Sequence, residues 1–234
     1  MRALVVGASG GLGAAFVAEL VADPRYTQVI LWTRSAAVAS GEKIIAHSID
    51  LRDEATIEKA AASLDEVDLA IVATGLLHDG HFKPEKSWQS LTPSAMIRAF
   101  EINTIGPALV AKHVLPHLPR DRRAVFAALS ARVGSISDNR LGGWHSYRAS
   151  KAALNQLIRC FSIELSLRRP LAICVGLHPG TVDTDLSKPY QGGVPDDKLF
   201  TPEWSALRLL DVLNVLTPAQ SGRVYDWAGA EVQA

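Results

Sequence analysis

The sequence Gly7-Ala8-Ser9-Gly10-Gly11-Leu12-Gly13 joins a short apolar run at residues 3–6 to a segment whose apolar residues recur at helical spacing. Such a run predicts a buried strand, and the spacing after it predicts an amphipathic helix. Glycines at this junction allow backbone N–H groups to approach a pyrophosphate, and the start of the helix adds a favourable dipole. The stretch therefore predicts a nucleotide-binding strand–turn–helix unit, with a tight turn of small residues as the alternative.

Strand-like and helix-like segments alternate from this unit to the end of the chain. Strands are predicted at residues 3–6, 29–32, 43–49, 68–74, 124–129, 171–177 and 223–227. Helices are predicted after the glycines, at 54–64, from Thr92-Pro93, at 147–167 and from Thr201-Pro202. This alternation favours an α/β fold, a doubly wound parallel sheet of about seven strands with helices on both faces. No linker interrupts it, so residues 1–234 are predicted to form a single Rossmann-fold domain.

The composition excludes several classes of function. Lys plus Arg equals Asp plus Glu at 24 each, so no net charge points to nucleic acid or an anionic membrane. A strand at residues 3–6 leaves no room for a cleaved signal sequence, and no apolar run reaches the ~18 residues that span a bilayer. We therefore expect a cytoplasmic protein in which Cys160 and Cys174 are reduced.

Ligands of such sheets bind beyond the carboxyl ends of the strands, where the loops at 75–92, 130–146 and 180–200 are long. An acidic residue after the second strand would grip the ribose 2′-hydroxyl of NAD(H), whereas this chain has Thr33 and Arg34 there. Because a guanidinium group suits a 2′-phosphate, NADP(H) is favoured and NAD(H) is the alternative. Asp50, after the third strand, is a candidate partner for the adenine amino group or a cap for the helix starting near Glu54.

Tyr147 and Lys151 place a phenol and an amine four residues apart in a predicted helix. That spacing brings both side chains onto one face, one turn apart. A free tyrosine loses its proton near pH ~10, and a nearby ammonium group lowers that pKa toward neutrality. The pair is a candidate for proton transfer, although such a spacing also arises by chance.

Together these motifs resemble the short-chain dehydrogenase/reductase family over almost the whole chain. The matching residues occur in the family's order: Gly7, Gly11, Gly13, Asp50-Leu51, Asn103, Ser130, Tyr147 to Lys151, and Pro179-Gly180-Thr181-Val182-Asp183-Thr184. The ending Ser221-Gly222-Arg223-Val224-Tyr225-Asp226-Trp227 is similar to the compact C-factor-like and sniffer-like carbonyl reductases. The resemblance implies an NADPH-dependent reductase of an aldehyde or ketone. It also implies a homodimer or homotetramer packed through the helices at about 93–116 and 147–167.

The resemblance assigns a role to each catalytic residue. Tyr147 would donate a proton to the carbonyl oxygen as hydride arrives from the nicotinamide, and Ser130 would hold that oxygen. Lys151 would contact the nicotinamide ribose and lower the pKa of Tyr147. Cofactor contacts are expected from Gly7, Gly11 and Gly13 of the glycine-rich turn and from Thr33, Arg34, Asp50 and Leu51 after the second and third strands. Further contacts are expected from Ser9, Gly10, Leu12, Ala73, Thr74, Gly75, Pro179, Gly180, Val182 and Thr184.

Pro107 bears on the role of Asn103. Proline has no N–H, so within a helix it cannot bond to the carbonyl four residues earlier, which belongs to Asn103. A kinked helix there leaves an acceptor that suits a water molecule. In the family such a water links the lysine to solvent, so Asn103 is expected to be a fourth catalytic residue, at the end of a relay from Tyr147 through the ribose and Lys151.

Two segments depart from the family's pattern. Val6 stands where threonine is usual, and Val72-Ala73-Thr74-Gly75 stands for Asn-Asn-Ala-Gly. The two regions commonly hydrogen-bond to each other. Since both are more apolar here, we expect packing to replace the polar contact.

The substrate site is expected in the later loops. The segment from Asp185 to Phe200 resembles a lid. Candidates for an apolar substrate pocket beside Ser130 and Tyr147 are Leu141, Trp144, Leu186 and Tyr190, with ordinary loop packing as the alternative. His78-Asp79-Gly80-His81 lacks further paired ligands, so no metal is expected.

Two other functions compete with carbonyl reduction. One is an NADP(H)-binding signalling or scaffold protein with little turnover, and the other is an NAD-dependent alcohol dehydrogenase. The intact set of Ser130, Tyr147 and Lys151 argues against a protein that only binds the cofactor. The substrate itself cannot be read from the loops of a single chain.

Overall fold

The computed structural model describes residues 1–34, 41–80 and 82–234. Within these residues the strands are β1 (Arg2–Val6), β2 (Gln28–Thr33), β3 (Ile44–Ser48), β4 (Leu69–Val72), β5 (Ala124–Leu129), β6 (Ala172–His178), β7 (Thr181–Val182), β8 (Leu199–Phe200) and β9 (Val224–Asp226). The α-helices are α1 (Gly11–Ala22), α2 (Glu54–Ala61), α3 (Pro93–Phe100), α4 (Gly106–Val114), α5 (His145–Arg168) and α6 (Pro202–Val215). A seven-stranded parallel sheet in the order β3-β2-β1-β4-β5-β6-β9 confirms the predicted fold.

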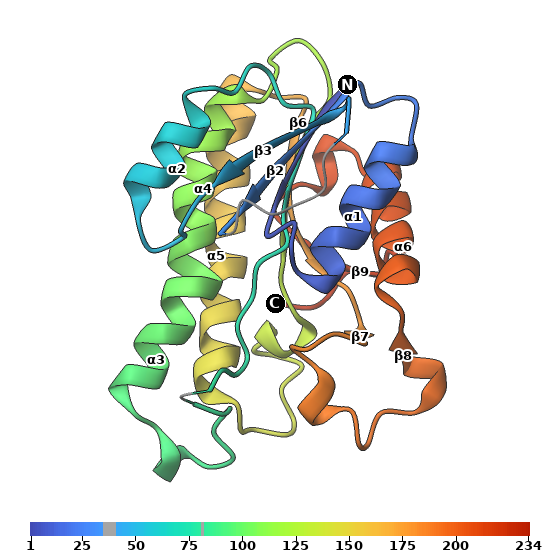
Figure 1. The fold of residues 1–234 in the computed structure, drawn as a ribbon. Helices are drawn as coiled ribbons and strands as arrows, with labels where there is room; N and C mark the ends of the chain where they lie inside the picture. Colours follow the sequence, from blue (N-terminus) through green and yellow to red (C-terminus); the bar gives the residue numbers. More distant parts are fainter. Residues whose placement is uncertain (35–40, 81) are drawn as a thin grey trace.

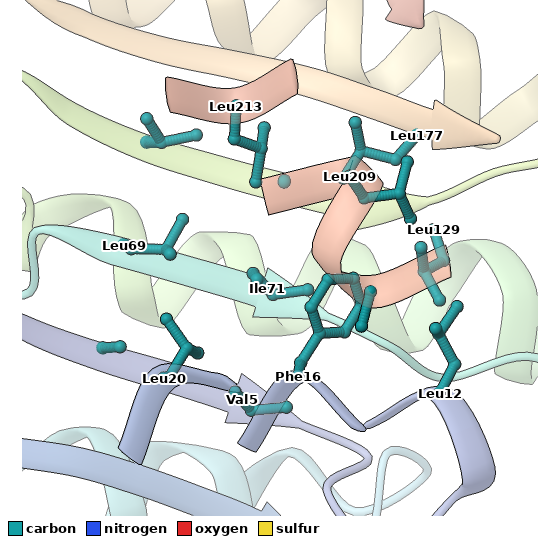
Figure 2. Packing of buried hydrophobic residues seen from close by; sticks show 14 of the residues in the cluster. Val5, Leu12, Phe16, Leu20, Leu69, Ile71, Leu129, Leu177, Leu209 and Leu213 are labelled. Atoms are coloured by element: carbon teal, nitrogen blue, oxygen red, sulfur yellow. The ribbon is translucent and has the colours of Figure 1, made fainter. Parts of the chain in front are cut away.

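Helices cover both faces of the sheet (Figure 1). One buried cluster joins α1 and α6 to one face, and a second joins α2, α4 and α5 to the other. Figure 2 shows Phe16 of α1 beside Ile71 of the sheet, and Leu209 of α6 belongs to the same buried cluster. Burying such a side chain contributes roughly 1.5–3 kcal/mol to the stability of the fold. The two clusters therefore hold the strands, and with them the strand ends, in fixed positions.

Side-chain caps explain where several helices begin. Thr92 and Thr201 accept hydrogen bonds from backbone N–H groups three residues ahead, at 3.3 and 3.2 Å, and proline follows each. These two starts confirm the prediction. The alternative role of Asp50 as a helix cap is wrong, because α2 begins at Glu54 and its cap is therefore Asp53, which accepts from the Ala55 N–H.

The predicted kink before Pro107 takes the form of a π-helical segment, Glu101–Ile105, between α3 and α4. The Gly106 N–H bonds to the carbonyl of Glu101, five residues back, so one extra residue is accommodated just before the proline. The segment buries Asn103 and turns its side chain toward the loop after β4.

Other boundaries differ little from expectation. The strand predicted at 68–74 ends at Val72, which leaves Ala73, Thr74 and Gly75 in the loop that follows it. Cys160 and Cys174 are free thiols, as predicted. None of the helices formed by the described residues combines the length and apolar character needed to cross a membrane.

Candidate active site

Two adjoining cavities lie beyond the carboxyl ends of the strands, with volumes of about 240 and 690 Å³. Both are bordered by residues 7–13, here called the glycine turn, and by the loop that follows β4. Of the predicted cofactor residues, the smaller cavity is lined by Gly7, Ser9, Gly10, Thr33, Arg34, Asp50, Leu51, Ala73, Thr74 and Gly75. The larger is lined by Ser9, Gly10, Gly11, Leu12, Ala73, Thr74, Gly75, Tyr147, Lys151, Pro179, Gly180, Val182 and Thr184. The shared border makes one elongated site, as an extended dinucleotide requires.

Glycines allow the backbone segments of the glycine turn to lie close to one another. Gly7 has φ +83°, and a Cβ on Gly13 would lie 2.1 Å from the Gly7 carbonyl oxygen. Gly13 lines neither cavity, so packing of the turn explains this glycine better than ligand contact does. The first turn of α1 has no acidic residue and Gly10 offers no side-chain cap. The helix dipole and its N–H groups are therefore available to an anion such as a pyrophosphate.

Charged groups gather at the smaller cavity. The Arg52 guanidinium, 3.0 Å from a carboxylate oxygen of Asp50, holds the pKa of that carboxyl below its usual range, and the charge of Arg34 adds to the effect. Arg34 is exposed at the cavity wall. Arg52 and Arg98 also line this cavity and were not predicted. The smaller cavity thus has one ionised acid and three arginines among its lining residues.

The loop after β4 meets the glycine turn through apolar atoms. A Cβ on Gly7 would lie 2.8 Å from the Thr74 methyl group, and Val6 and Val72 share one buried cluster. This agrees with packing in place of the family's usual polar contact. The Thr74 hydroxyl is buried and has no hydrogen-bond partner among the described residues. A hydroxyl with no partner here suits a polar ligand in the adjoining cavities.

Ser130, Tyr147 and Lys151 open onto the larger cavity. Helix α5 carries Tyr147 and Lys151 one turn apart, and Ser130 follows the end of β5. The Lys151 Nζ atom lies 5.8 Å from the centre of the Tyr147 ring and donates to the Leu129 carbonyl at 2.7 Å. The structure therefore brings three of the four predicted catalytic residues, all except Asn103, to one cavity wall.

Burial controls the charges of the phenol and the amine. It raises the pKa of Tyr147 to about 12 and lowers the pKa of Lys151 to about 7. The lysine bonds to a neutral carbonyl, and desolvation disfavours both charged forms. Burial alone accounts for the raised Tyr147 pKa, so the expectation that Lys151 lowers this pKa beside a bound cofactor stays a prediction.

Asn103 has a structural contact that the sequence did not reveal. Its side chain accepts from the Leu76 N–H and donates to the Leu76 carbonyl, each at 2.8 Å, and donates to the Ser150 hydroxyl at 3.1 Å. It is fully buried and lines neither cavity. The side chain ties the loop after β4 to α5, while the predicted relay uses the main-chain carbonyl of Asn103.

The outer part of the larger cavity is aromatic. The ring centres of Trp144 and Tyr190 lie 5.2 Å apart, and those of Trp144 and Tyr147 lie 6.3 Å apart. Leu186 also lines the cavity. Leu141 was wrongly placed in this pocket, since it is 90% exposed and lines neither cavity. The chain after it passes through three residues of positive φ, and this turn brings Trp144 to the cavity instead.

Glu85 holds this turn in place and was not predicted. Its carboxylate accepts from the backbone N–H and the hydroxyl of Ser146, and its carbonyl accepts from the Trp144 N–H at 2.6 Å. Glu85 is buried, although it lies far from α5 in the sequence. A carboxylate at this helix start is favourable, and it fixes the residues just before Tyr147.

The segment predicted as a lid is anchored at both ends. Strand β7, just before the segment, pairs in parallel with β8 at its end. A Cβ on Gly11 would lie 2.8 Å from the methyl group of Thr184, so the residue that precedes the segment packs against the glycine turn. The imidazole of His78 lies 3.1 Å from the Asp185 carbonyl, and no group of described residues could hold a metal ion. His81 lies outside the described residues.

Comparison with known proteins identifies the class that this fold and site define. A family model described as short chain dehydrogenase matches residues 1–193. The chain belongs to the short-chain dehydrogenase/reductase family and is an oxidoreductase of that family.

Individual relatives span most of the chain. The C-signal of Myxococcus xanthus is 41% identical over 138 residues, which cover 58% of this chain and 77% of the relative. The 1-hydroxy-2-glutathionyl-2-methyl-3-butene dehydrogenase of Rhodococcus sp. (strain AD45) is 31% identical over 230 residues, 98% of each chain. The NADPH-bound carbonyl reductase from chicken fatty liver has a TM-score of 0.86 at 28% identity, covering 100% of this chain and 98% of that one.

Proposed function

We propose that this protein is an NADPH-dependent carbonyl reductase that converts an aldehyde or ketone to an alcohol. The observation that carries the proposal is the convergence of Ser130, Tyr147 and Lys151 on the cavity that also borders the glycine turn. A protein that only binds the cofactor needs the turn but has no need of a hydroxyl and a phenol beside the same cavity.

The proposed chemistry divides the work between the cofactor and the side chains. The bound cofactor supplies a hydride for the carbonyl carbon. Tyr147, with its pKa raised to about 12, is a neutral phenol at neutral pH and has a proton to give to the carbonyl oxygen. Ser130 holds that oxygen, and the negative charge that develops on it is stabilised by hydrogen bonds in a site shielded from water. Trp144, Leu186 and Tyr190 supply that shielding.

Lys151 would hold the nicotinamide ribose and lower the Tyr147 pKa once the cofactor replaces lost hydration with polar partners. The predicted relay continues through a water at the Asn103 carbonyl. A high-resolution cofactor complex tests it: a water bridging Lys151 and Asn103 is expected, and a dry gap between them would contradict the relay.

Arg34 supports the choice of NADP(H). Its exposed side chain lines the smaller cavity together with an ionised Asp50, and a guanidinium suits a 2′-phosphate. The chicken structure is described as NADPH-bound, and a 26% identical dehydrogenase/reductase from Burkholderia multivorans as NADP-bound. Arg34→Ala should raise the dissociation constant for NADPH about tenfold or more and leave that for NADH nearly unchanged. Equal loss for both cofactors would contradict the assignment.

A second candidate is oxidation of an alcohol by the same site. The relative from Rhodococcus that matches almost the whole chain is named a dehydrogenase, and the residues proposed for reduction also serve the reverse direction. In that direction the Tyr147 phenolate would accept the proton. Initial rates measured in both directions at equal cofactor concentration separate the two.

Apolar side chains on the helices support a further proposal of self-association. Ile97 of α3 is 59% exposed and Ile163 of α5 is 52% exposed, and these two helices pack together. We propose a homodimer or homotetramer through this surface. Light scattering of the wild type should give a molar mass that is a multiple of 25.1 kDa. Ile163→Glu should lower this mass toward that of the monomer.

The function is tested by consumption of NADPH against a panel of aldehydes and ketones. Tyr147→Phe is the matched variant, since it keeps the ring and removes the proton donor. We expect turnover by the wild type and a loss of at least about 1,000-fold in the variant, with NADPH binding, measured by fluorescence, retained. Binding without turnover on any substrate would instead favour the signalling or scaffold function.

A further inference from the structure

We infer that Asn155 is a positioning residue that controls whether Ser130 can donate a hydrogen bond to the substrate oxygen. The inference rests on the proposed function. Asn155 lies on α5 four residues after Lys151 and eight after Tyr147, so it extends the same helix face. The Ser130 hydroxyl donates to the Asn155 Oδ1 atom at 2.6 Å.

The bond to Asn155 uses the only proton of the Ser130 hydroxyl. A serine hydroxyl has one proton and two lone pairs, and here the proton is given to Asn155. The Ser130 backbone N–H is also engaged, by the Leu177 carbonyl at 2.7 Å. Ser130 therefore presents only lone pairs to the cavity in this arrangement. A carbonyl oxygen is an acceptor and gains nothing from lone pairs, so Ser130 must recover its proton before it can hold the substrate.

Rotation of the Asn155 amide group by half a turn supplies that proton. Rotation exchanges Oδ1 and Nδ2 at nearly the same place, so that Nδ2 donates to the Ser130 oxygen and the hydroxyl proton is free to point into the cavity. Within the described part of the chain the Nδ2 atom makes no other hydrogen bond that the rotation would break. A hydroxyl that accepts a bond also becomes a stronger donor. The donating orientation of Asn155 is thus the one suited to carbonyl reduction.

Asn155→Asp and Asn155→Ala distinguish this role from a structural one. Aspartate has nearly the same shape and keeps the observed bond from Ser130, but its carboxylate can only accept. If Asn155 served structure alone, Asp would be tolerated and Ala would be the harmful change. If Asn155 frees the Ser130 proton, Asp holds that proton permanently and is the worse change, whereas Ala leaves the hydroxyl free to turn.

We expect Asn155→Asp to lower kcat about 100-fold at pH 7–8, the effect of losing one donor to the reacting oxygen, and Asn155→Ala to lower it about tenfold or less. KM for NADPH and the thermal midpoint should stay near wild type in both. The kcat of the Asp variant should rise as the pH falls toward the pKa of the new carboxyl, because the protonated acid can donate. Adding Ser130→Ala to Asn155→Asp should cause little further loss.

A second measurement reads the hydrogen bond without turnover. A ketone with a ¹³C-labelled carbonyl is bound to Tyr147→Phe protein with oxidised cofactor, and its C=O stretch is recorded by infrared difference spectroscopy. Donation from Ser130 lowers this frequency, and Asn155→Asp should return it to the value found with Ser130→Ala.

An Asn155→Asp variant that keeps half or more of the wild-type kcat, or an unchanged C=O frequency, would overturn the inference. These outcomes leave the proposed function intact if Tyr147→Phe is inactive. Turnover retained by Tyr147→Phe would instead refute the proposed function itself.

Discussion

Lys151 makes the stability of the protein depend on pH in a direction that the structure determines. The side chain is 2% exposed, and burial lowers its pKa to about 7, whereas an unfolded lysine titrates near ~10.4. Between these values the unfolded chain binds a proton that the folded chain does not. The free energy of unfolding must therefore rise with pH across this range, because stability increases wherever the unfolded state binds more protons.

The magnitude follows from the two pKa values. Complete transfer of one proton changes stability by about 1.4 kcal/mol per pH unit. Since the folded lysine is about half protonated at pH 7, the gain between pH 7 and pH 9 is about 2 kcal/mol for this residue. For a chain of 234 residues this corresponds to roughly 4–8 °C in the thermal midpoint.

Lys151→Met is the matched variant, since methionine keeps an unbranched chain and cannot be protonated. Urea unfolding of both proteins without cofactor at pH 7, 8 and 9 gives the difference in slope, and titrating groups that they share cancel. The wild type should gain about 2 kcal/mol more than the variant. Parallel profiles would refute the assignment of a desolvated amine at this site, whatever the constant offset between the two proteins.

Three further outcomes are expected from other residues. Glu85→Ala should destabilise the fold by about 1–3 kcal/mol in urea unfolding, because it leaves buried donors of Ser146 without a partner. Glu85→Gln should destabilise it less, and equal losses of stability in the two variants would contradict this role of Glu85. Burial lowers the pKa of His178 to about 4, so stability should fall by about 2 kcal/mol between pH 6.5 and 4.5, and His178→Gln should remove that loss. Val6→Thr should lower or leave unchanged the thermal midpoint, since it buries a hydroxyl among apolar groups, and a clear rise would count against packing in place of a polar contact.

The sequence predicted the fold well because the signals are local. Apolar runs mark the strands, and Thr92-Pro93 and Thr201-Pro202 mark helix starts whose caps the structure shows. Pro107 predicted a break in its helix because proline lacks the N–H group that would continue the helical hydrogen bonds. Ser130, Tyr147 and Lys151 were also found at one cavity, because Ser130 follows a strand at the edge of the sheet where ligands bind and α5 carries the other two one turn apart.

The errors concern contacts between distant segments. Leu141 and Trp144 lie in one loop, and only its backbone turn decides which of them faces the cavity. Glu85 has no signal in the sequence, because its partners lie about 60 residues away along the chain. Asn155 did have a signal, since it continues the four-residue spacing of Tyr147 and Lys151. The charge of a buried pair also depends on hydration, which spacing alone does not report.

Transfer of hydride to a carbonyl carbon in this site is the central claim, and it is tested most directly by a single turnover with NADPH deuterated at both C4 positions. A ketone reduced in the wild-type panel assay is mixed with excess enzyme, and the alcohol is analysed by mass spectrometry. We predict one deuterium on the carbinol carbon with the wild type, and no alcohol from Tyr147→Phe within the time of the wild-type turnover. Alcohol without deuterium, or labelled alcohol formed equally fast by the variant, would contradict the account.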